Sequence, residues 1–469
     1  MEEPSRLPRF SPWAWPLAAL FLLAALFACR QDLDFDIGFH LKAGQWIVQH
    51  QAVPREDAFT YTVAGHPYVD MLWLYEAACY GLQRLGGLTL LSAVHDLLIL
   101  AAFALLTRRT FRSAAPPAVS LVLLLGALLC LELRFLMRPE ALSWVFFFLA
   151  WRLLEDRHRP GARPLLWLSL LQVAWVNTEG LFILQWVLVG AYALGAWWET
   201  RRPEPLLLKA LGLSLLASLL NPYLFQGLLF PFTLLGHLAP GDPFHGSIAE
   251  FQSPWAPLRQ QSAPFFPALP LALYKVLGLG SLFLVAATWR KRAAWERLLV
   301  PVFFALSAFS IRNVPFFLFI ALPTAAAALR DLLDSPKPWV AGLSRRLSLP
   351  WPAPWLTLVM ALLAARVSTQ AYYVADRRMV HNGFGVDEQH IPVKAVDFLS
   401  QFQLGGAVLN DLGFGAWLDW KGPAPVFLDG RLEVLGADFY SRFLASYQPG
   451  GLKPLLDRYG VQLVLLDHM

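Results

Sequence analysis

The chain has 469 residues, a formal net charge of +5, 57% hydrophobic residues and only 15% charged residues. Soluble domains carry roughly a quarter charged residues, so a soluble protein of this length could not bury so much apolar surface. The composition therefore excludes a soluble globular protein. In a membrane protein the basic residues mainly set topology, so the positive charge does not indicate a nucleic-acid partner.

Long apolar runs, separated by short arginine-rich stretches, predict a polytopic helical membrane protein. The run at 12–29 follows two arginines, as in a signal peptide, but bulky Phe27 before Cys29 argues against cleavage, so we expect a retained membrane helix. We expect about eleven transmembrane helices in all. They lie near 12–29, 87–107, 117–133, 140–154, 164–176, 181–198, 206–220, 268–289, 298–310, 314–330 and 352–368.

The arginine and lysine residues of the loops favour one orientation. With the N-terminus in the cytoplasm, most of them fall on the inner side, as the positive-inside rule requires. We therefore expect a multi-pass membrane protein whose N-terminus lies in the cytoplasm. The segment 71–86 is interpreted as an amphipathic helix on the outer surface, because a crossing there would place the arginine cluster of 108–112 outside. The alternative, a true span at 71–86, remains open.

The chain changes character after residue 368. Short apolar stretches alternate with amphipathic ones, and glycines separate them, which is typical of a small α/β domain. The expected strands are 407–410, 425–429 and 461–466, and the expected helices are 392–402, 436–447 and 451–459. We therefore expect a mainly α transmembrane domain at 1–368, with a large first outer loop at 30–86, and an extracytoplasmic α/β domain at 369–469. A domain of that size is near the lower limit of independent stability and should pack on the membrane part.

The first outer loop begins with paired carboxylates. Asp34 and Asp36 stand two residues apart and point the same way in an extended segment, so both can converge on one ligand. Close carboxylates raise one another's pKa, which suits a general base. The pair can also hold a divalent cation, although the sequence requires none. The structural alternative is N-capping of a helix near 37–50, which contains His40 and should lie at the membrane interface.

Four basic residues lie near the outer ends of predicted spans. A cation so close to hydrocarbon needs an anionic partner, and a substrate phosphate or a lipid headgroup would serve. The alternative is snorkelling of the long side chains to the headgroup region. The four residues are Arg134, Arg138, Lys275 and Arg312.

Other polar residues stand in less informative patterns. His95 and Asp96 lie inside an apolar helix, where a functional pair and a buried structural pair are equally well supported. Asn177 and Glu179 precede a helix, and capping would explain both. The loop 237–250 carries four side chains of metal-binding types, in a spacing that matches no known pattern. These are His237, Asp242, His245 and Glu250.

The stretch "VFLDGR" near the C-terminus places Asp429 and Arg431 on either side of Gly430. The end of a strand is where α/β folds place binding residues, but the same pattern fits a salt-bridged turn. The sequence contains no P-loop, GxGxxG, HExxH or GxSxG motif, so soluble nucleotide chemistry is not supported.

Five stretches resemble the GT-C superfamily of integral-membrane glycosyltransferases, and more closely a group of bacterial membrane proteins of that type. They are "DFDIGFHLKAGQWIV", "VPREDAFTYTVAGHPYVD", "RNVPFFLFIALP", "LNDLGFGAWLDW" and "VFLDGR". The resemblance implies a polyprenyl-phosphate-linked sugar as donor and membrane lipids as surroundings. It also implies that Asp34 or Asp36 deprotonates or orients the acceptor.

The resemblance further implies that polar residues at the outer surface bind the substrates. These are His40, Arg134, Arg138, Glu179, Lys275 and Arg312. The chain departs from the family pattern at three places. Gly38 and Phe39 precede the histidine where two aromatic residues are usual, Leu72 stands where an acidic residue is frequent, and Glu179 replaces a histidine.

Two other functions compete with glycosyl transfer. A transporter or flippase of lipid-linked glycans predicts charged residues along a path through the membrane and internal repeats, of which the sequence shows little. A non-catalytic envelope assembly protein predicts that changes at Asp34 and Asp36 are tolerated. The sequence indicates no particular protein partner, and glycosyl transfer is the favoured hypothesis.

Overall fold

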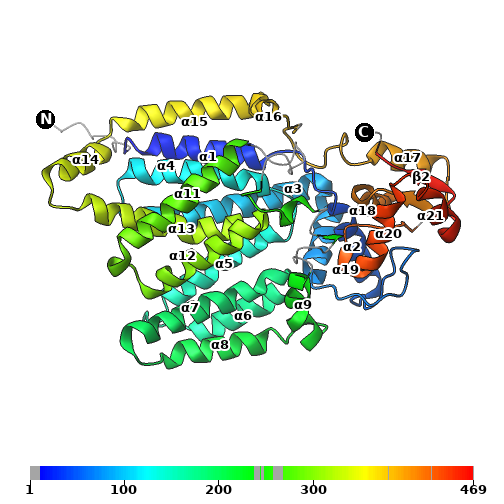
Figure 1. The fold of residues 1–469 in the computed structure, drawn as a ribbon, viewed down its shortest axis with the longest axis horizontal. Helices are drawn as coiled ribbons and strands as arrows, with labels where there is room; N and C mark the ends of the chain where they lie inside the picture. Colours follow the sequence, from blue (N-terminus) through cyan, green and yellow to red (C-terminus); the bar gives the residue numbers. More distant parts are fainter. Residues whose placement is uncertain are drawn as a thin grey trace, which may run out of the picture. The chain divides into compact units, whose positions relative to one another are not determined.

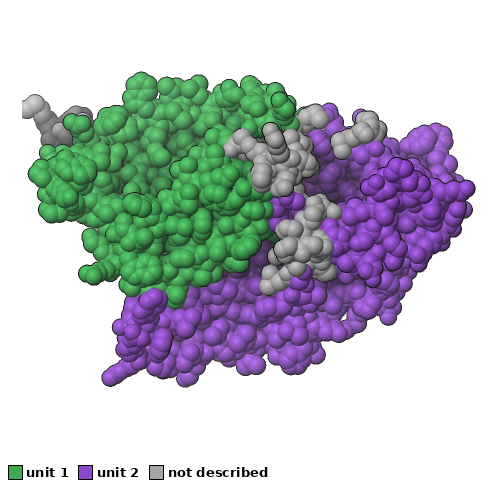
Figure 2. Space-filling view, viewed as in Figure 1, with its two compact units in different colours: residues 1–30, 99–135, 253–382 green, residues 31–98, 136–252, 383–469 purple. Residues whose placement is uncertain are grey.

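A computed structural model describes residues 11–236, 243–244, 248–256, 268–378, 380–423 and 425–467, and these residues are mainly helical (Figure 1). The chain forms two compact units, each assembled from three separate stretches (Figure 2). Unit 1 comprises Met1–Arg30, Ile99–Phe135 and Ser253–Asn382, and unit 2 comprises Gln31–Leu98, Leu136–Gln252 and Gly383–Met469. These units divide the chain by compactness. The expected boundary at residue 368 instead separates membrane-spanning residues from residues outside the membrane, and it stays a prediction.

Unit 1 is built around one helix that is buried on every side. In α13 (Val314–Leu333), each residue from 314 to 326 is buried, and such an all-round apolar helix belongs in a core. Figure 1 shows α1 and α15 lying side by side in this unit. The remaining elements of the unit are α1 (Ala14–Ala28), the part of α3 (Trp73–Arg112) from Ile99 onward, α4 (Pro117–Leu131), η1 (Glu132–Arg134), α11 (Ala268–Ala287), η4 (Trp289–Lys291), α12 (Ala294–Phe309), η5 (Ile311–Asn313), α14 (Pro338–Ser348), α15 (Pro352–Ser368) and α16 (Ala371–Ala375).

The long helix α3 (Trp73–Arg112) is interrupted at a pair of glycines. Gly86 and Gly87 have non-helical backbone angles, and Gly87 has φ of 67° and ψ of −168°, a conformation that only glycine adopts readily. The break falls at the end of the predicted amphipathic segment 71–86. That segment is therefore a helix distinct in direction from the apolar helix that follows it.

Unit 2 combines a group of apolar helices with the first loop and the C-terminal segment. Two of its described helices, α6 and α8, start with proline, because proline lacks the N–H that the first turn leaves unpaired. The helices of the first part are α2 (Ile37–His50), α5 (Glu140–Glu155), α6 (Pro164–Val176), η2 (Gly180–Phe182), α7 (Ile183–Thr200), α8 (Pro205–Ala217), α9 (Phe225–Gly236) and η3 (Ala249–Phe251).

The C-terminal segment of unit 2 contains two parallel strands, β1 (Val408–Asn410) and β2 (Leu463–Leu465), paired with Val408 opposite Leu463. The expected strand at 425–429 is wrong, because only Val426 forms isolated bridges there, to Thr60 and to Val408. The helices of this segment are α17 (Val393–Gln401), α18 (Leu412–Lys421), α19 (Leu432–Leu435), α20 (Ala437–Ser446) and α21 (Leu452–Tyr459).

Close packing of α2 on α18 depends on glycine. A Cβ atom on Gly38 would collide with the backbone carbonyl of Ala416, and one on Gly415 would collide with that of Leu428. No larger side chain fits at either position without moving backbone. Gly38, one of the departures from the family pattern, is thus required by the packing of α2.

Five described helices are long and apolar enough to cross a membrane, or six if the bent pair α14 and α15 forms one span. The five are Trp73–Arg112, Pro117–Arg134, Gly180–Thr200, Leu269–Ala287 and Ile311–Leu333, and shorter apolar helices are Ala14–Ala28, Pro164–Val176 and Pro205–Ala217. Each predicted apolar segment forms a helix, with ends that differ by a few residues. The total of eleven spans stays a prediction.

Candidate functional site

Three carboxylates of unit 2 surround one guanidinium group. Arg138 donates from Nε to Asp34 Oδ2 and from Nη2 to Asp34 Oδ1 at 2.8 Å. Its Nη2 also donates to Asp36 Oδ2 at 2.9 Å, and its Nη1 donates to Glu250 Oε1. We call these four residues the carboxylate–arginine cluster.

The two aspartates do not cap the helix that follows them. Asp36 is the N-cap residue of α2, yet its side chain makes no capping hydrogen bond. Its backbone N–H instead donates to Asp34 Oδ1 at 3.2 Å. The capping interpretation is therefore wrong, and both carboxylates face Arg138.

Neighbouring side chains fix the backbone at Arg138. The backbone N–H of Met137 donates to Asp32 Oδ1 at 3.2 Å, and the N–H of Asp32 donates to the carbonyl of Gly385 at 2.8 Å. On the other side, His95 Nε2 lies 3.2 Å from the carbonyl oxygen of Arg138 and 3.1 Å from the Tyr75 hydroxyl. His95 therefore supports the turn that carries Arg138.

The electrostatic environment of Asp36 suits proton transfer. Burial raises the pKa of Asp36 to about 7, the neighbouring Asp34 and Glu250 add to the rise, and Arg138 opposes it. The Asp36 side chain is 28% exposed, whereas that of Asp34 is 2% exposed. A reachable carboxyl that titrates near neutral pH can accept a proton from a substrate.

His40 lies in α2 and contacts Glu76 rather than the two aspartates. Its Nδ1 is 3.0 Å from Glu76 Oε1, and the side chain of Glu76 is fully buried. Burial, with smaller contributions from Arg138 and His95, lowers the pKa of His40 to about 3, so the imidazole is neutral at physiological pH. Its contact with Glu76 joins α2 to α3.

The C-terminal turn "VFLDGR" reaches Asp36. A Cβ atom on Gly430 would collide with Asp36 Oδ1, so the backbone of this turn lies directly against the carboxylate. The flanking Arg431 binds Asp429 (Nη2 to Oδ2, 2.5 Å) and Asp57 (Nη1 to Oδ1, 2.9 Å). The salt-bridged turn is confirmed, and it also completes the surroundings of Asp36.

The other predicted site residues are not in the cluster. Glu179 precedes η2, is 3% exposed and makes no capping hydrogen bond, so the capping explanation is wrong for it. Three residues belong to unit 1, and their roles stay predictions. They are Arg134 in η1, Lys275 in α11, whose Nζ lies 5.5 Å from the Trp255 ring centre, and Arg312 in η5.

Sequence reasoning singled out Glu250 only as a member of a metal-binding loop. Three other members of that loop, His237, Asp242 and His245, lie outside the described residues. Within the described part of the chain, no group of three or more His, Cys, Asp or Glu side chains is arranged to hold a metal ion. The signal that could have identified Glu250 is its negative charge, because Arg138 needs an anionic partner.

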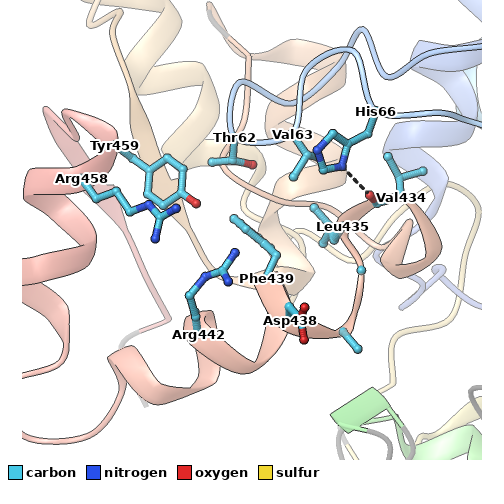
Figure 3. Close-up of a pocket in the computed structure, with 12 residues that line it drawn as sticks. Thr62, Val63, His66, Val434, Leu435, Asp438, Phe439, Arg442, Arg458 and Tyr459 are labelled. Atoms are coloured by element: carbon cyan, nitrogen blue, oxygen red, sulfur yellow. Dashed lines mark hydrogen bonds between the residues drawn. The ribbon is translucent and has the colours of Figure 1, made fainter.

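A separate hollow of about 550 Å³ lies in unit 2, between the first loop and the C-terminal helices (Figure 3). Figure 3 shows Arg442 and Arg458 beside it, together with Phe439 and Tyr459. Neither arginine pairs with a carboxylate of the described residues, and Arg458 lies over the Tyr459 ring at 5.5 Å. Unpaired arginines attract anions, so the hollow favours a negatively charged ligand.

No protein-family model matches the sequence, and no curated protein sequence matches it. Solved structures of the Archaeoglobus fulgidus oligosaccharyltransferase do match. The apo form has a TM-score of 0.64 and 12% identity, over 98% of this chain and 70% of that chain. A complex of the archaeal protein, AglB, with an inhibitory peptide and a dolichol-phosphate has a TM-score of 0.60 and 12% identity, over 97% and 69% of the two chains.

A third structure of the same protein, in complex with Zn and sulfate, has a TM-score of 0.59 and 12% identity, over 96% of this chain and 68% of that chain. At such low identity the likeness shows the fold alone. The chain therefore has the fold of these oligosaccharyltransferases.

Proposed function

We propose that the chain is a glycosyltransferase that moves a sugar from a polyprenyl-phosphate-linked donor to an acceptor at the outer face of a bacterial inner membrane. The observation that carries this proposal is the carboxylate–arginine cluster on an oligosaccharyltransferase fold. The dolichol-phosphate in the complex of AglB is a lipid phosphate of the kind that such a donor would leave behind.

The cluster has the parts that the reaction needs. Asp36 accepts the proton of the acceptor hydroxyl as that oxygen attacks the anomeric carbon of the sugar. The bond to the lipid phosphate breaks, and its electron pair stays on the phosphate oxygen. The positive charge of Arg138 then stabilises the departing phosphate. Asp34 binds Arg138 through two hydrogen bonds and keeps its guanidinium in a fixed orientation.

The membrane arrangement in this proposal follows the sequence. With eleven spans, the first loop and residues 369–469, as an α/β domain, lie on the outer side. The lipid tail of the donor stays in the bilayer, and its sugar is exposed at that outer surface. The glycine break at Gly86–Gly87 supports a surface helix at 71–86, because it gives that helix a direction of its own. Arg134, Lys275 and Arg312 are proposed to contact lipid or donor phosphates.

A divalent metal does not fit the cluster as the structure arranges it. One archaeal structure is a complex with Zn, which makes a metal at Asp34 and Asp36 a natural question. In this chain, however, each of these aspartates and Glu250 directs at least one carboxylate oxygen to the Arg138 guanidinium. The proposed mechanism therefore contains no step through a metal.

The test is transfer by the purified protein in lipid nanodiscs, with a panel of polyprenyl-phosphate sugars and oligosaccharide acceptors. Release of polyprenyl phosphate together with a glycosylated acceptor supports the proposal. Movement of the intact donor across sealed vesicles, without release of lipid phosphate, would favour a transporter. Donor binding without either event, across the panel, would favour an assembly protein.

The pH dependence of transfer should show a rising limb with an apparent pKa near 7. Asp36 must be deprotonated to act as a base, and its pKa is about 7, so kcat/KM increases as the pH rises through that value. Glu250→Gln removes a negative charge that raises this pKa, and should shift the limb to lower pH. The control Asp457→Asn, an exposed change on α21, should leave the limb in place. A profile without this limb would contradict the role of Asp36 as the base.

The hollow beside Arg442 and Arg458 is proposed to bind an anionic acceptor. The double change Arg442→Glu and Arg458→Glu should raise the KM for acidic acceptors about tenfold, because it replaces attraction by repulsion. Donor hydrolysis without acceptor should not change. Lys453→Glu, an exposed charge reversal on α21 outside the hollow, is the matched control. Equal KM values for acidic acceptors in the double variant and the control would show that the acceptor does not bind in the hollow.

A further inference from the structure

Every nitrogen of the Arg138 guanidinium faces a carboxylate. Nε and Nη2 bind the two oxygens of Asp34, Nη2 also binds Asp36, and Nη1 binds Glu250. A guanidinium has five N–H groups, and contacts within the described part of the chain use four of them. One N–H of Nη1 is left for a substrate.

A guanidinium and a divalent cation require different spacings of their oxygen partners. The acceptors around a guanidinium lie roughly 3.5–4 Å from its central carbon, because each N–H···O bond adds about 2.9 Å to a C–N bond. A divalent cation such as Ca²⁺ or Mg²⁺ requires oxygens at roughly 2.0–2.6 Å. An ion among these carboxylates would also meet the positive charge of Arg138 at short range. Guanidinium and metal therefore exclude one another.

Contacts with neighbouring residues fix the backbone position of Arg138. Its carbonyl is held by His95, and the preceding N–H of Met137 is held by Asp32. Both supports act on the backbone and do not depend on the guanidinium. Loss of the guanidinium alone would thus leave the turn in place and the three carboxylates facing an open space.

We propose that Arg138 is the resident cation of the cluster and takes the place of a divalent ion. Once the guanidinium is removed, the side chains of Asp34, Asp36 and Glu250 can close inward to the shorter spacing that a divalent cation requires. The inference rests on the proposed function only for its catalytic consequence, which is that transfer by the wild type needs no added metal. The binding consequence concerns the cluster itself.

Mn²⁺ binding to the purified full chain, measured by electron paramagnetic resonance of the free ion, tests the proposal. The wild type should bind no Mn²⁺ at the cluster, whereas Arg138→Gln should bind one ion at least about tenfold more tightly than any wild-type site. Adding Asp36→Asn to Arg138→Gln should abolish this binding. Arg378→Gln is the matched control. It removes another largely buried arginine, but its partner Glu132 still keeps Arg30.

Three results would overturn the proposal. The first is a Mn²⁺ site in the wild type that Asp36→Asn removes. The second is an Arg138→Gln protein that is folded, as its melting curve shows, and binds no Mn²⁺. The third is wild-type transfer that a chelator stops and Mn²⁺ restores. If Arg138→Gln does not fold, the first and third results, both measured on the wild type, test the proposal. A wild type without any transferase activity would refute the proposed function and leave the Mn²⁺ results valid.

Discussion

Asp36→Asn should lower the rate of glycosyl transfer by about 10²- to 10⁴-fold and leave donor binding nearly unchanged. This is the range expected for the loss of a general base, because asparagine cannot accept the acceptor proton. Asparagine keeps the size of the side chain and can still accept a hydrogen bond from Arg138 Nη2. Single-turnover measurements on enzyme with donor already bound would separate the chemical step from binding.

Two other substitutions sharpen this test. Asp34→Asn weakens the two-point contact that orients Arg138, so it should slow departure of the phosphate. It also removes a negative charge that raises the pKa of Asp36, so the rising limb should persist but move to lower pH. Asp457→Asn on the exposed face of α21 should retain full activity. If Asp36→Asn keeps transfer within about threefold of the wild type, Asp36 is not the base.

Arg431→Met should be the most destabilising single change considered in this chain. The side chain of Arg431 is 2% exposed, and those of its partners Asp57 and Asp429 are fully buried. Breaking a buried ion pair by removing one partner costs about 3–5 kcal/mol, because the remaining charges stay buried without compensation. The guanidinium also lies 4.6 Å from the Phe59 ring centre, and this contact is lost too. A lower melting temperature in detergent, followed by tryptophan fluorescence, would show the effect.

The matched control for this change is Arg442→Met. Arg442 is exposed and has no carboxylate partner among the described residues, so its replacement should shift the melting temperature little. Adding Asp57→Asn to Arg431→Met should recover part of the loss, because it removes one of the two buried charges left unpaired. Equal melting temperatures for Arg431→Met and Arg442→Met would contradict the role assigned to the buried ion pairs.

The helices could be predicted from the sequence because long apolar runs must form them in a membrane. The strand at 425–429 could not, because an apolar run specifies a strand only if a partner is available along its length. Here Val426 alone meets Thr60 and Val408. The close approach of Gly38 to Ala416 is likewise a tertiary contact, and a single sequence does not show it.

The site was predictable in part. The spacing of Asp34 and Asp36 indicated that both could reach one ligand, and the outer position of Arg138 indicated that it needed an anion. The sequence did not show that Arg138 binds these two aspartates, because the residues come from different loops. Glu250 meets Arg138 and Gly430 meets Asp36 only because distant segments come together, and the sequence carries no local pattern for such contacts.

The contact of Gly430 with Asp36 has a consequence for biosynthesis. The ribosome makes both aspartates and Arg138 early, but it makes the glycine turn only after all the described helices that are long and apolar enough to cross a membrane. Asp36 therefore cannot reach its final surroundings until the chain has been synthesised as far as Gly430. Under the proposed function, a chain that ends before Gly430 lacks the finished surroundings of Asp36 and should not consume lipid-linked sugars.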